Sequence, residues 1–446
     1  MNQPNPNKQP IVQSTLEQTS NEEVDTVLGR FTLFVKDLSN GLNGSQEVPP
    51  SQESVSEEAE VISRKIIVLG QTFDNFDTAN DYIESKLWLS YRCGFEPIPK
   101  SIDGPQPIQF FPSIIFNRGT IYSNFANLKS LFDKENFTSD AGWGCMIRTS
   151  QNLLANTLLK LYPKNEPEIV KLFQDGTSSP FSIHNFIRVA SLLPLHVKPG
   201  EWFGPNAASL SIKRLASELL QDQEIDGIKI PRVFISENSD LFDDEIRDVF
   251  AKEKNASVLI LFPIRLGIDK VNSYYYNSIF HLLASKYSCG IAGGKPSSSF
   301  YFLGYEDTDL IYFDPHLPQV VETPINMDSY HTTKYNRLNI SLLDPSMMIG
   351  ILVTNIDEYI DFKTSCIDNN NKIVHFHPHT LPVQQDSIIN QSWEEVQDEE
   401  EEFINLNVSK IENEQQQEQG QLTDAPDEFI DIGNQLLLVV LVPSNV

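Results

Sequence analysis

The chain has 446 residues, 40% of them hydrophobic, which is enough apolar content for one large folded domain or two ordinary ones. It is strongly acidic, because 61 Asp and Glu outnumber 33 Lys and Arg and give a formal net charge of −28. Binding to nucleic acid requires a basic surface, so this composition argues against nucleic acid as a general partner. Four widely spaced cysteines without a CxxC pair argue against a disulfide framework and against a cysteine zinc site.

Both ends of the chain are expected to lie outside the folded core. Residues 1–62 are rich in Asn, Gln, Ser, Glu and Pro, which predicts a disordered leader. The N-terminus lacks the basic start and the apolar region of a signal peptide, and the apolar run Leu436–Val442 is too short to cross a bilayer. We therefore expect a cytoplasmic protein with one folded domain at 63–380.

Within that domain, helical and strand patterns follow one another along the chain. Helical spacing of apolar residues predicts helices within 78–95, 146–161, 181–193, from about 207 to 220, within 274–290 and before 366. Apolar runs bounded by turn residues predict strands from 64, within 256–267, twice within 298–322 and from 347. Residues 97–138 form a long, partly Pro-rich insertion to which the sequence assigns no role. Helices come early and strands late, so the predicted fold class is α+β, or mixed α/β.

A single cysteine, Cys145, stands where a glycine-containing loop meets a predicted helix, in the stretch SDAGWGCMIRTSQNLL. The N–H groups and the dipole at a helix N-terminus stabilise a thiolate, and an N–H there can donate to an oxyanion. Gly142 and Gly144 leave room for a substrate. A small buried core residue fits the same local pattern, so a base elsewhere in the chain has to decide between the two interpretations.

His316 is the best candidate for that base among eight histidines. It lies in LIYFDPH, two residues after Asp314 at the end of a predicted strand, where alternate residues face the same way. Asp314 is therefore expected to fix the tautomer of the imidazole and to favour its charged form. A different hypothesis is metal binding by the HFHPH tract of His375, His377 and His379, whose alternative is a solvated loop broken by proline.

Five stretches, two of which contain the Cys145 and His316 segments, occur in a fixed order: SKLWLSYRCGFEPI, TSDAGWGCMIRTSQNLLANTL, PGEWFGPNAAS, GIAGGKPSSSFYFLGYEDTDLIYFDPH and LLDPSMMIG. Together they resemble the autophagins, the autophagy-related cysteine proteases with a papain-like fold, over residues 64–365. The resemblance implies a nucleophile at Cys145 with His316 as its partner and Asp314 as the residue that orients the histidine. It also implies that Tyr91 donates to the oxyanion beside the N–H of Cys145.

The same resemblance implies a substrate and the residues that contact it. Trp202 of EWFGP would cover a narrow groove for the substrate's glycine, and Gly293–Phe300, with Lys295 and Pro296, would be a mobile loop that shields the site. The implied reaction cuts ubiquitin-like autophagy modifiers after a C-terminal glycine and releases them from phosphatidylethanolamine. The implied enzyme is a monomer without cofactor or metal, and it meets autophagic membranes transiently through the lipidated substrate.

Three other functions stay open at this point. The first is a catalytically silent adaptor that only holds modifiers, the second is a papain-like acyltransferase, and the third is a metalloenzyme at the HFHPH tract.

The acidic tail, residues 381–446, offers a second binding element. From Gln385 to Val446 the chain carries 15 acidic residues and one basic residue. An aromatic and an aliphatic residue three apart, behind acidic residues, can add as a strand to the sheet edge of a basic modifier. Two segments have this pattern and are predicted docking motifs, Phe403 with Leu406 and Phe429 with Ile432. A tail that only adds solubility is the alternative.

Overall fold

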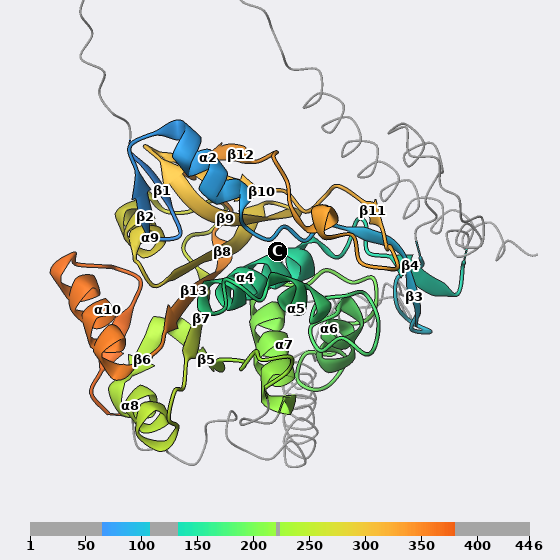
Figure 1. The fold of residues 1–446 in the computed structure, drawn as a ribbon, viewed down its shortest axis with the longest axis horizontal. Coiled ribbons are helices and arrows are strands. Elements are labelled where there is room, and N and C mark those ends of the chain that lie inside the picture. Colours follow the sequence, from blue (N-terminus) through green and yellow to red (C-terminus); the bar gives the residue numbers. More distant parts are fainter. Residues whose placement is uncertain (1–64, 108–132, 220–223, 380–446) are drawn as a thin grey trace, which may run out of the picture. The chain divides into compact units, whose positions relative to one another are not determined.

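The structure is a computed structural model that describes residues 65–107, 133–219 and 224–379 (Figure 1). The predicted leader and the predicted docking motifs at Phe403, Leu406, Phe429 and Ile432 lie outside the described residues, as does most of the 97–138 insertion.

The described chain contains helices and strands throughout, which agrees with the predicted mixed α/β class. Its α-helices are α2 (Phe76–Glu84), α4 (Cys145–Leu161), α5 (Glu166–Lys171), α6 (Ile183–Ala190), α7 (Pro205–Glu218), α8 (Asp243–Lys252), α9 (Tyr276–Ala284) and α10 (Ile356–Asp368). The strands are β1 (Ile66–Val68), β2 (Gln71–Phe73), β3 (Arg92–Pro99), β4 (Asn136–Ser139), β5 (Arg232–Ile235), β6 (Asp240–Phe242), β7 (Val258–Arg265), β8 (Ser288–Lys295), β9 (Ser298–Glu306), β10 (Asp309–Phe313), β11 (Gln319–Val320), β12 (Asn336–Asn339), β13 (Ser346–Val353) and β14 (His375–His377).

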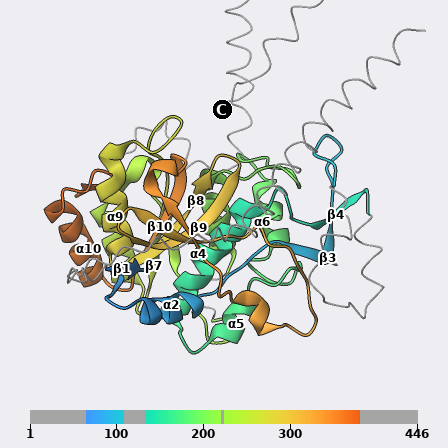
Figure 2. The same ribbon diagram turned by 90° about the horizontal axis from the view of Figure 1, so that it is seen from above.

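The main sheet runs in the order β12-β10-β9-β8-β13-β7-β5, and β1 joins it by pairing with both β9 and β2. Its neighbours are antiparallel except β5 and β7, which are parallel. A smaller sheet has the order β11-β3-β4 and lies to one side of the main sheet in both ribbon views (Figures 1 and 2).

Helices cover both faces of the main sheet. On β7, Leu259 and Leu261 join one buried cluster, whereas Ile260 and Phe262 join another, because successive strand residues point to opposite faces. The first cluster takes in α4, α6 and α7, and the second takes in α9 and α10. Figure 2 shows α9 and α10 on the opposite side of the strands from α6. The architecture is therefore three-layered.

Helix α4 is buried around nearly its whole circumference, and only Lys160 and Leu161 of its residues are not buried. The sequence predicts a helix with one broad buried face. The difference arises because α4 packs on β8 and β9 while further helices and the extended segment Leu87–Tyr91 cover its other sides. The helix that begins with Cys145 is thus held firmly in the domain.

Three predicted boundaries are wrong. The helical pattern within 78–95 forms a helix only to Glu84, because the chain beyond it is extended and hydrogen-bonds to α4. The helix predicted to end near Gly290 ends at Ala284, and Ser288 already begins β8. The predicted loop Gly293–Phe300 is mostly a hairpin, since Lys295 pairs with Ser298 across a two-residue turn.

No helix in the described part of the chain is long and apolar enough to cross a membrane.

Candidate active site

The backbone before Cys145 makes a tight turn that only glycine permits. Gly142 has φ +89°, in the left-handed region that favours glycine. A Cβ atom at Gly144 would lie 2.7 Å from Oδ2 of Asp140, too close for any other residue. The turn closes when the N–H of Gly144 donates to the carbonyl oxygen of Asp140 at 2.8 Å. Cys145 then becomes the first residue of α4, so its sulfur stands at a helix N-terminus, as predicted.

Asp314 and His316 form a hydrogen-bonded pair. One oxygen of Asp314, Oδ1, lies 2.5 Å from Nδ1 of His316 and also accepts from the backbone N–H of His316 at 2.9 Å. The predicted pair therefore exists, but the predicted reason is wrong. Strand β10 ends at Phe313, and the two side chains meet because Asp314 folds back over its own turn.

The structure also brings His316 to Cys145. Burial opposes charge on the imidazole, but hydrogen bonds with Asp314 and Cys145 outweigh it and raise the pKa of His316 to about 10. Burial also acts against the Asp314 carboxylate, yet the bond from His316 keeps the pKa of that carboxyl below its usual value. The three residues thus favour an imidazolium held between the sulfur of Cys145 and the carboxylate of Asp314.

Tyr91 completes this group on the side of Cys145. It forms a small buried cluster with Ala141 and Cys145, and its ring meets the imidazole of His316 edge to face at 5.3 Å. Burial, followed by the charges of Cys145 and Asp140, raises the pKa of Tyr91 well above its ordinary value. Its hydroxyl therefore keeps its proton and is able to donate a hydrogen bond.

The backbone around Tyr91 is attached to the loop that carries His316. The N–H of Tyr91 donates to Pro315 at 2.8 Å, and its carbonyl oxygen accepts from Gln319 at 2.9 Å. Nε1 of Trp88 donates to the carbonyl oxygen of Asp314 at 2.9 Å. These contacts fix Tyr91 and His316 relative to each other even though 97–138 is inserted between Tyr91 and Cys145.

Lys295 and Pro296 lie at the exposed tip of the β8–β9 hairpin. Burial raises the pKa of Asp314, and the charge of Lys295 adds to the larger effect of the His316 contacts, which lower it. On the same hairpin, Phe300 packs edge to face on His316 with ring centroids 5.6 Å apart. The hairpin therefore borders the site.

Trp202 is 45% exposed in the loop before α7. The buried cluster around Cys145 consists of Tyr91, Ala141 and Cys145 and does not include Trp202. Unlike Tyr91, this candidate contact residue is not brought into the buried group.

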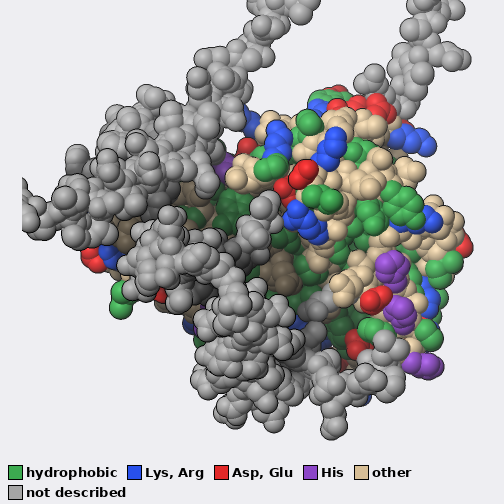
Figure 3. Space-filling view, turned by 180° about the vertical axis from the view of Figure 1, so that it is seen from behind, with side chains coloured by type: hydrophobic (Ala, Val, Ile, Leu, Met, Phe, Trp, Pro, Cys, Tyr) green, Lys and Arg blue, Asp and Glu red, His purple; other side chains and the backbone are tan. Residues whose placement is uncertain are grey.

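The HFHPH tract contains β14, which pairs with β6, and its Phe376 packs against the second cluster and not the cluster that contains α4. His377 contacts Oδ1 of Asp240 at 2.7 Å and stacks on Phe242, while His375 and His379 are exposed. Histidine side chains gather at one edge of the face in Figure 3. Among the residues that the structure describes, no group of three or more His, Cys, Asp or Glu is placed to hold a metal ion.

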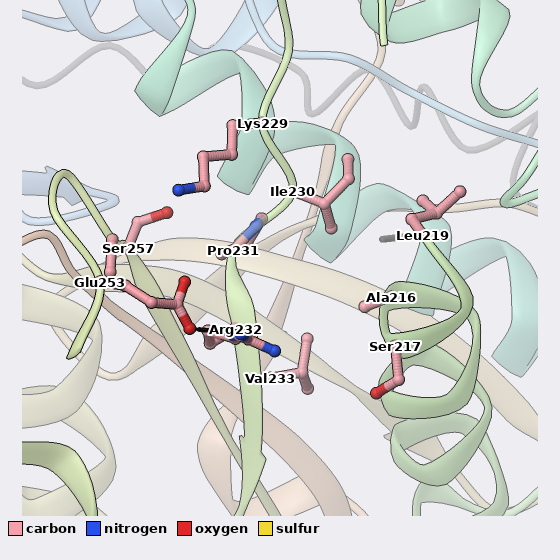
Figure 4. A pocket seen from close by; sticks show the side chains of 11 residues that line it. Ala216, Ser217, Leu219, Lys229, Ile230, Pro231, Arg232, Val233, Glu253 and Ser257 are labelled. Atoms are coloured by element: carbon pink, nitrogen blue, oxygen red, sulfur yellow. Dashed lines mark hydrogen bonds and ion pairs between the residues drawn. The ribbon is translucent and has the colours of Figure 1, made fainter. Parts of the chain in front are cut away.

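A surface pocket also lies apart from Cys145, between the C-terminal end of α7 and the start of β5 (Figure 4). An ion pair between Arg232 and Glu253 crosses it, and its lining contains neither cysteine nor histidine. It therefore lacks the cysteine–histidine pair that the site around Cys145 contains.

Several residues that support the site were not predicted from the sequence. Asp140 and Arg148 form a fully buried ion pair, with Oδ2 of Asp140 2.6 Å from Nε of Arg148. Trp88 holds the Asp314 turn. The sequence contained a signal for the ion pair, because Arg148 lies eight residues after Asp140, in a helix predicted to have a broad buried face, and a buried charge needs a partner.

Comparisons with known proteins agree with this geometry. The model of the peptidase C54 catalytic domain matches residues 76–365. The chain is 97% identical over 446 residues to Cysteine protease ATG4 of Candida albicans, covering 100% of both chains. It is 47% identical to Probable cysteine protease ATG4 of Scheffersomyces stipitis, over 83% of this chain and 71% of that protein. The protein of the same name in Debaryomyces hansenii is 48% identical, over 78% and 72%. The chain therefore belongs to the peptidase C54 family, the autophagins, and is an autophagy-related cysteine protease with a papain-like fold.

Proposed function

We propose that this protease cuts the precursor of a ubiquitin-like autophagy modifier after a glycine, and that it also releases the modifier from phosphatidylethanolamine. In both reactions the enzyme breaks an amide at the carbonyl of the glycine that becomes the C-terminus of the modifier, and only the leaving amine differs. The observation that supports this best is the buried group in which His316 contacts both Asp314 and Cys145.

In the proposed mechanism the sulfur of Cys145 attacks the glycine carbonyl while His316 carries the proton as an imidazolium. The amide C–N bond breaks, His316 gives its proton to the leaving amine, and a thioester remains on Cys145. Water then adds to the thioester with His316 as the base, and the thiol is restored. The raised pKa of His316 supports this role because the imidazolium is available to protonate the amine.

The oxyanion of each tetrahedral intermediate would accept from the N–H of Cys145 and from the hydroxyl of Tyr91. The cluster that Tyr91 forms with Cys145 and the raised pKa of its hydroxyl support this assignment. Charge that develops on the substrate oxygen would then meet donors that are already in position.

Selectivity for glycine would come from a narrow entrance. We assign its cover to Trp202 and its rim to Lys295 and Pro296, which lie exposed on the loop before α7 and on the β8–β9 hairpin. A glycine has no side chain, so a narrow channel excludes other residues at that position.

The proposed organisation is a leader at 1–62, a protease domain at 63–380 and a tail at 381–446. The tail would bind the modifier through Phe403 with Leu406 or Phe429 with Ile432, which raises the local concentration of substrate.

The test compares wild type with Cys145→Ala on modifier precursor and on modifier conjugated to phosphatidylethanolamine in vesicles, read by mass spectrometry. We expect wild type to yield modifier ending in glycine from both substrates and Cys145→Ala to yield none. Precursor left intact by wild type would favour a silent adaptor. A product joined to an added amine in place of hydrolysis would favour an acyltransferase.

A further inference from the structure

Asp140 occupies an unusual place beside the nucleophile. It is fully buried and belongs to the turn that leads into α4. Its carbonyl oxygen accepts from the N–H groups of Trp143 and Gly144, at 3.2 and 2.8 Å, so Asp140 closes the turn directly before Cys145.

Asp140 also hydrogen-bonds to the backbone of Arg92, the residue after Tyr91. Its Oδ1 accepts from the backbone N–H of Arg92 at 2.7 Å, and its own N–H donates to the carbonyl oxygen of Arg92 at 3.3 Å. The backbone N–H and the carbonyl oxygen of Arg92, the residue after Tyr91, therefore both hydrogen-bond to Asp140. The other carboxylate oxygen, Oδ2, accepts from Nε of Arg148 on α4 at 2.6 Å.

Asp140 thus joins three parts of the site: the turn before Cys145, the backbone that carries Tyr91, and the helix α4. The Asp140 side chain packs tightly against the turn, because a Cβ atom at Gly144 would collide with it. A second carboxylate, Asp175, also pairs with Arg148, at 2.9 Å from Nη1. Neither a hydrogen bond nor an ion pair in the described part of the chain links Asp175 to the backbone of Arg92 or to the turn.

We propose that Asp140 is a positioning residue that holds the hydroxyl of Tyr91 against Cys145 by fixing the backbone of Arg92 to the turn before the nucleophile. This inference rests on the proposed function, because it gives Tyr91 the role of oxyanion donor. Asp140 itself does not touch the reacting atoms. Its effect on the reaction passes through Tyr91.

The test is a double-mutant cycle of Asp140→Asn and Tyr91→Phe, with Asp175→Asn as the matched control. The amide of Asp140→Asn cannot accept from both Arg92 and Arg148, so one donor is left facing an NH2 group. Asp175→Asn removes the same charge from the same arginine without touching the Arg92 backbone. Activity is measured on modifier precursor and on a fluorogenic peptide ending in glycine, and folding is followed by circular dichroism and thermal unfolding.

We expect Asp140→Asn to lower kcat by about 10- to 100-fold with little change in KM, since small displacements of a catalytic group have costs of this size. The same substitution in a Tyr91→Phe background should change kcat little. Asp175→Asn should keep a kcat close to that of wild type even where it lowers the unfolding temperature. The rate at which iodoacetamide labels Cys145, and its dependence on pH, should be the same in Asp140→Asn and wild type.

Four outcomes would overturn the inference: an unchanged kcat in Asp140→Asn, an equal loss in Asp175→Asn, an undiminished loss when Tyr91 is already Phe, or slowed labelling of Cys145. The last would mean that Asp140 acts on the nucleophile alone. Wild type that cuts the peptide but leaves the precursor intact would contradict the proposed substrate instead, and the cycle would still be measured on the peptide.

Discussion

At the scale of single residues, the protonation state of the His316 imidazole is set by its neighbours. It is buried, a condition that disfavours charge, and yet the hydrogen bond with Asp314 and then that with Cys145 raise its pKa to about 10. A group with a raised pKa in the folded state stabilises the protein below its unfolded pKa, near 6.5, and this contribution is lost as the pH rises toward 10. Both activity and folding stability are therefore expected to depend on the same proton, the one that Asp314 helps to hold on His316.

Asp314→Asn should accordingly shift the alkaline limb of the profile of kcat/KM against pH toward lower pH. Removing the carboxylate takes away the charge that holds the proton on His316, and an opposite charge at this distance shifts a pKa by roughly 1–3 units. The rate should also fall at every pH, because the imidazole loses its fixed orientation. The measurement is the pH dependence of peptide hydrolysis under kcat/KM conditions.

A second carboxylate–histidine pair serves as the control for that prediction. Oε1 of Glu166 lies 2.9 Å from Nε2 of His331, outside the buried group around Cys145. Glu166→Gln should leave the alkaline limb where it is in wild type. An equal shift in both variants would show that the limb reports general charge and not the pair at the site.

Some residues of the site could be predicted from their spacing in the sequence, and others could not. Asp314 and His316 could be predicted as a pair because they stand two apart, although the structure joins them by a turn and not by strand alternation. Tyr91 could be named only by resemblance, since its place beside Cys145 depends on Asp140 and Pro315, which come from distant parts of the chain.

At the scale of elements, α4 does more than present Cys145. The side-chain amide of Asn156 accepts from the N–H of Leu87 and donates to its carbonyl oxygen, at 3.0 and 2.9 Å. Asn152, one turn earlier, makes the same two bonds with Leu89, at 2.7 and 2.9 Å. The two side-chain amides thus satisfy the backbone N–H and carbonyl groups of Leu87 and Leu89, as the backbone of a neighbouring strand would.

This explains why the helix predicted to continue past Glu84 stops there. The apolar residues Tyr82, Ile83, Leu87 and Tyr91 keep helical spacing, so the local pattern favours a longer helix. Hydrogen bonds to α4 override it. The missed start of β8 at Ser288 has a similar cause, because its small residues show no strand pattern and its pairing with β9 and β13 is long-range.

Asn156→Leu should lower the free energy of unfolding by about 1–3 kcal/mol, because it leaves buried N–H and C=O groups of Leu87 without partners. Thr157→Val is the control, since its buried hydroxyl bonds to Leu153 within the same helix and holds no part of the extended segment. Urea denaturation measures both variants. A loss no larger for Asn156→Leu than for Thr157→Val would contradict the role given to the amides.

At the scale of the whole molecule, two cores share one sheet. The first contains α4 and supports the site, and the second lies under α9 and α10. The mixed α/β class and the order of the motifs could be predicted from the sequence. Which helix covers which face could not, because β7 and β13 are apolar on both sides and their sequences do not distinguish one face from the other.

Among the residues that the structure describes, both cores lie between Ile66 and Phe376. Deleting residues 385–446 should therefore leave the unfolding temperature unchanged while it raises KM for modifier precursor, because the deletion removes both proposed docking motifs and not the cores. The paired substitution Phe403→Ala with Leu406→Ala, and likewise Phe429→Ala with Ile432→Ala, assigns the effect to one motif. KM on the fluorogenic peptide, whose glycine carbonyl is joined to the fluorophore by an amide, is the internal control, since this peptide has no modifier surface for the tail to bind. An unchanged KM for precursor after the deletion would contradict docking and would favour a tail that only adds solubility.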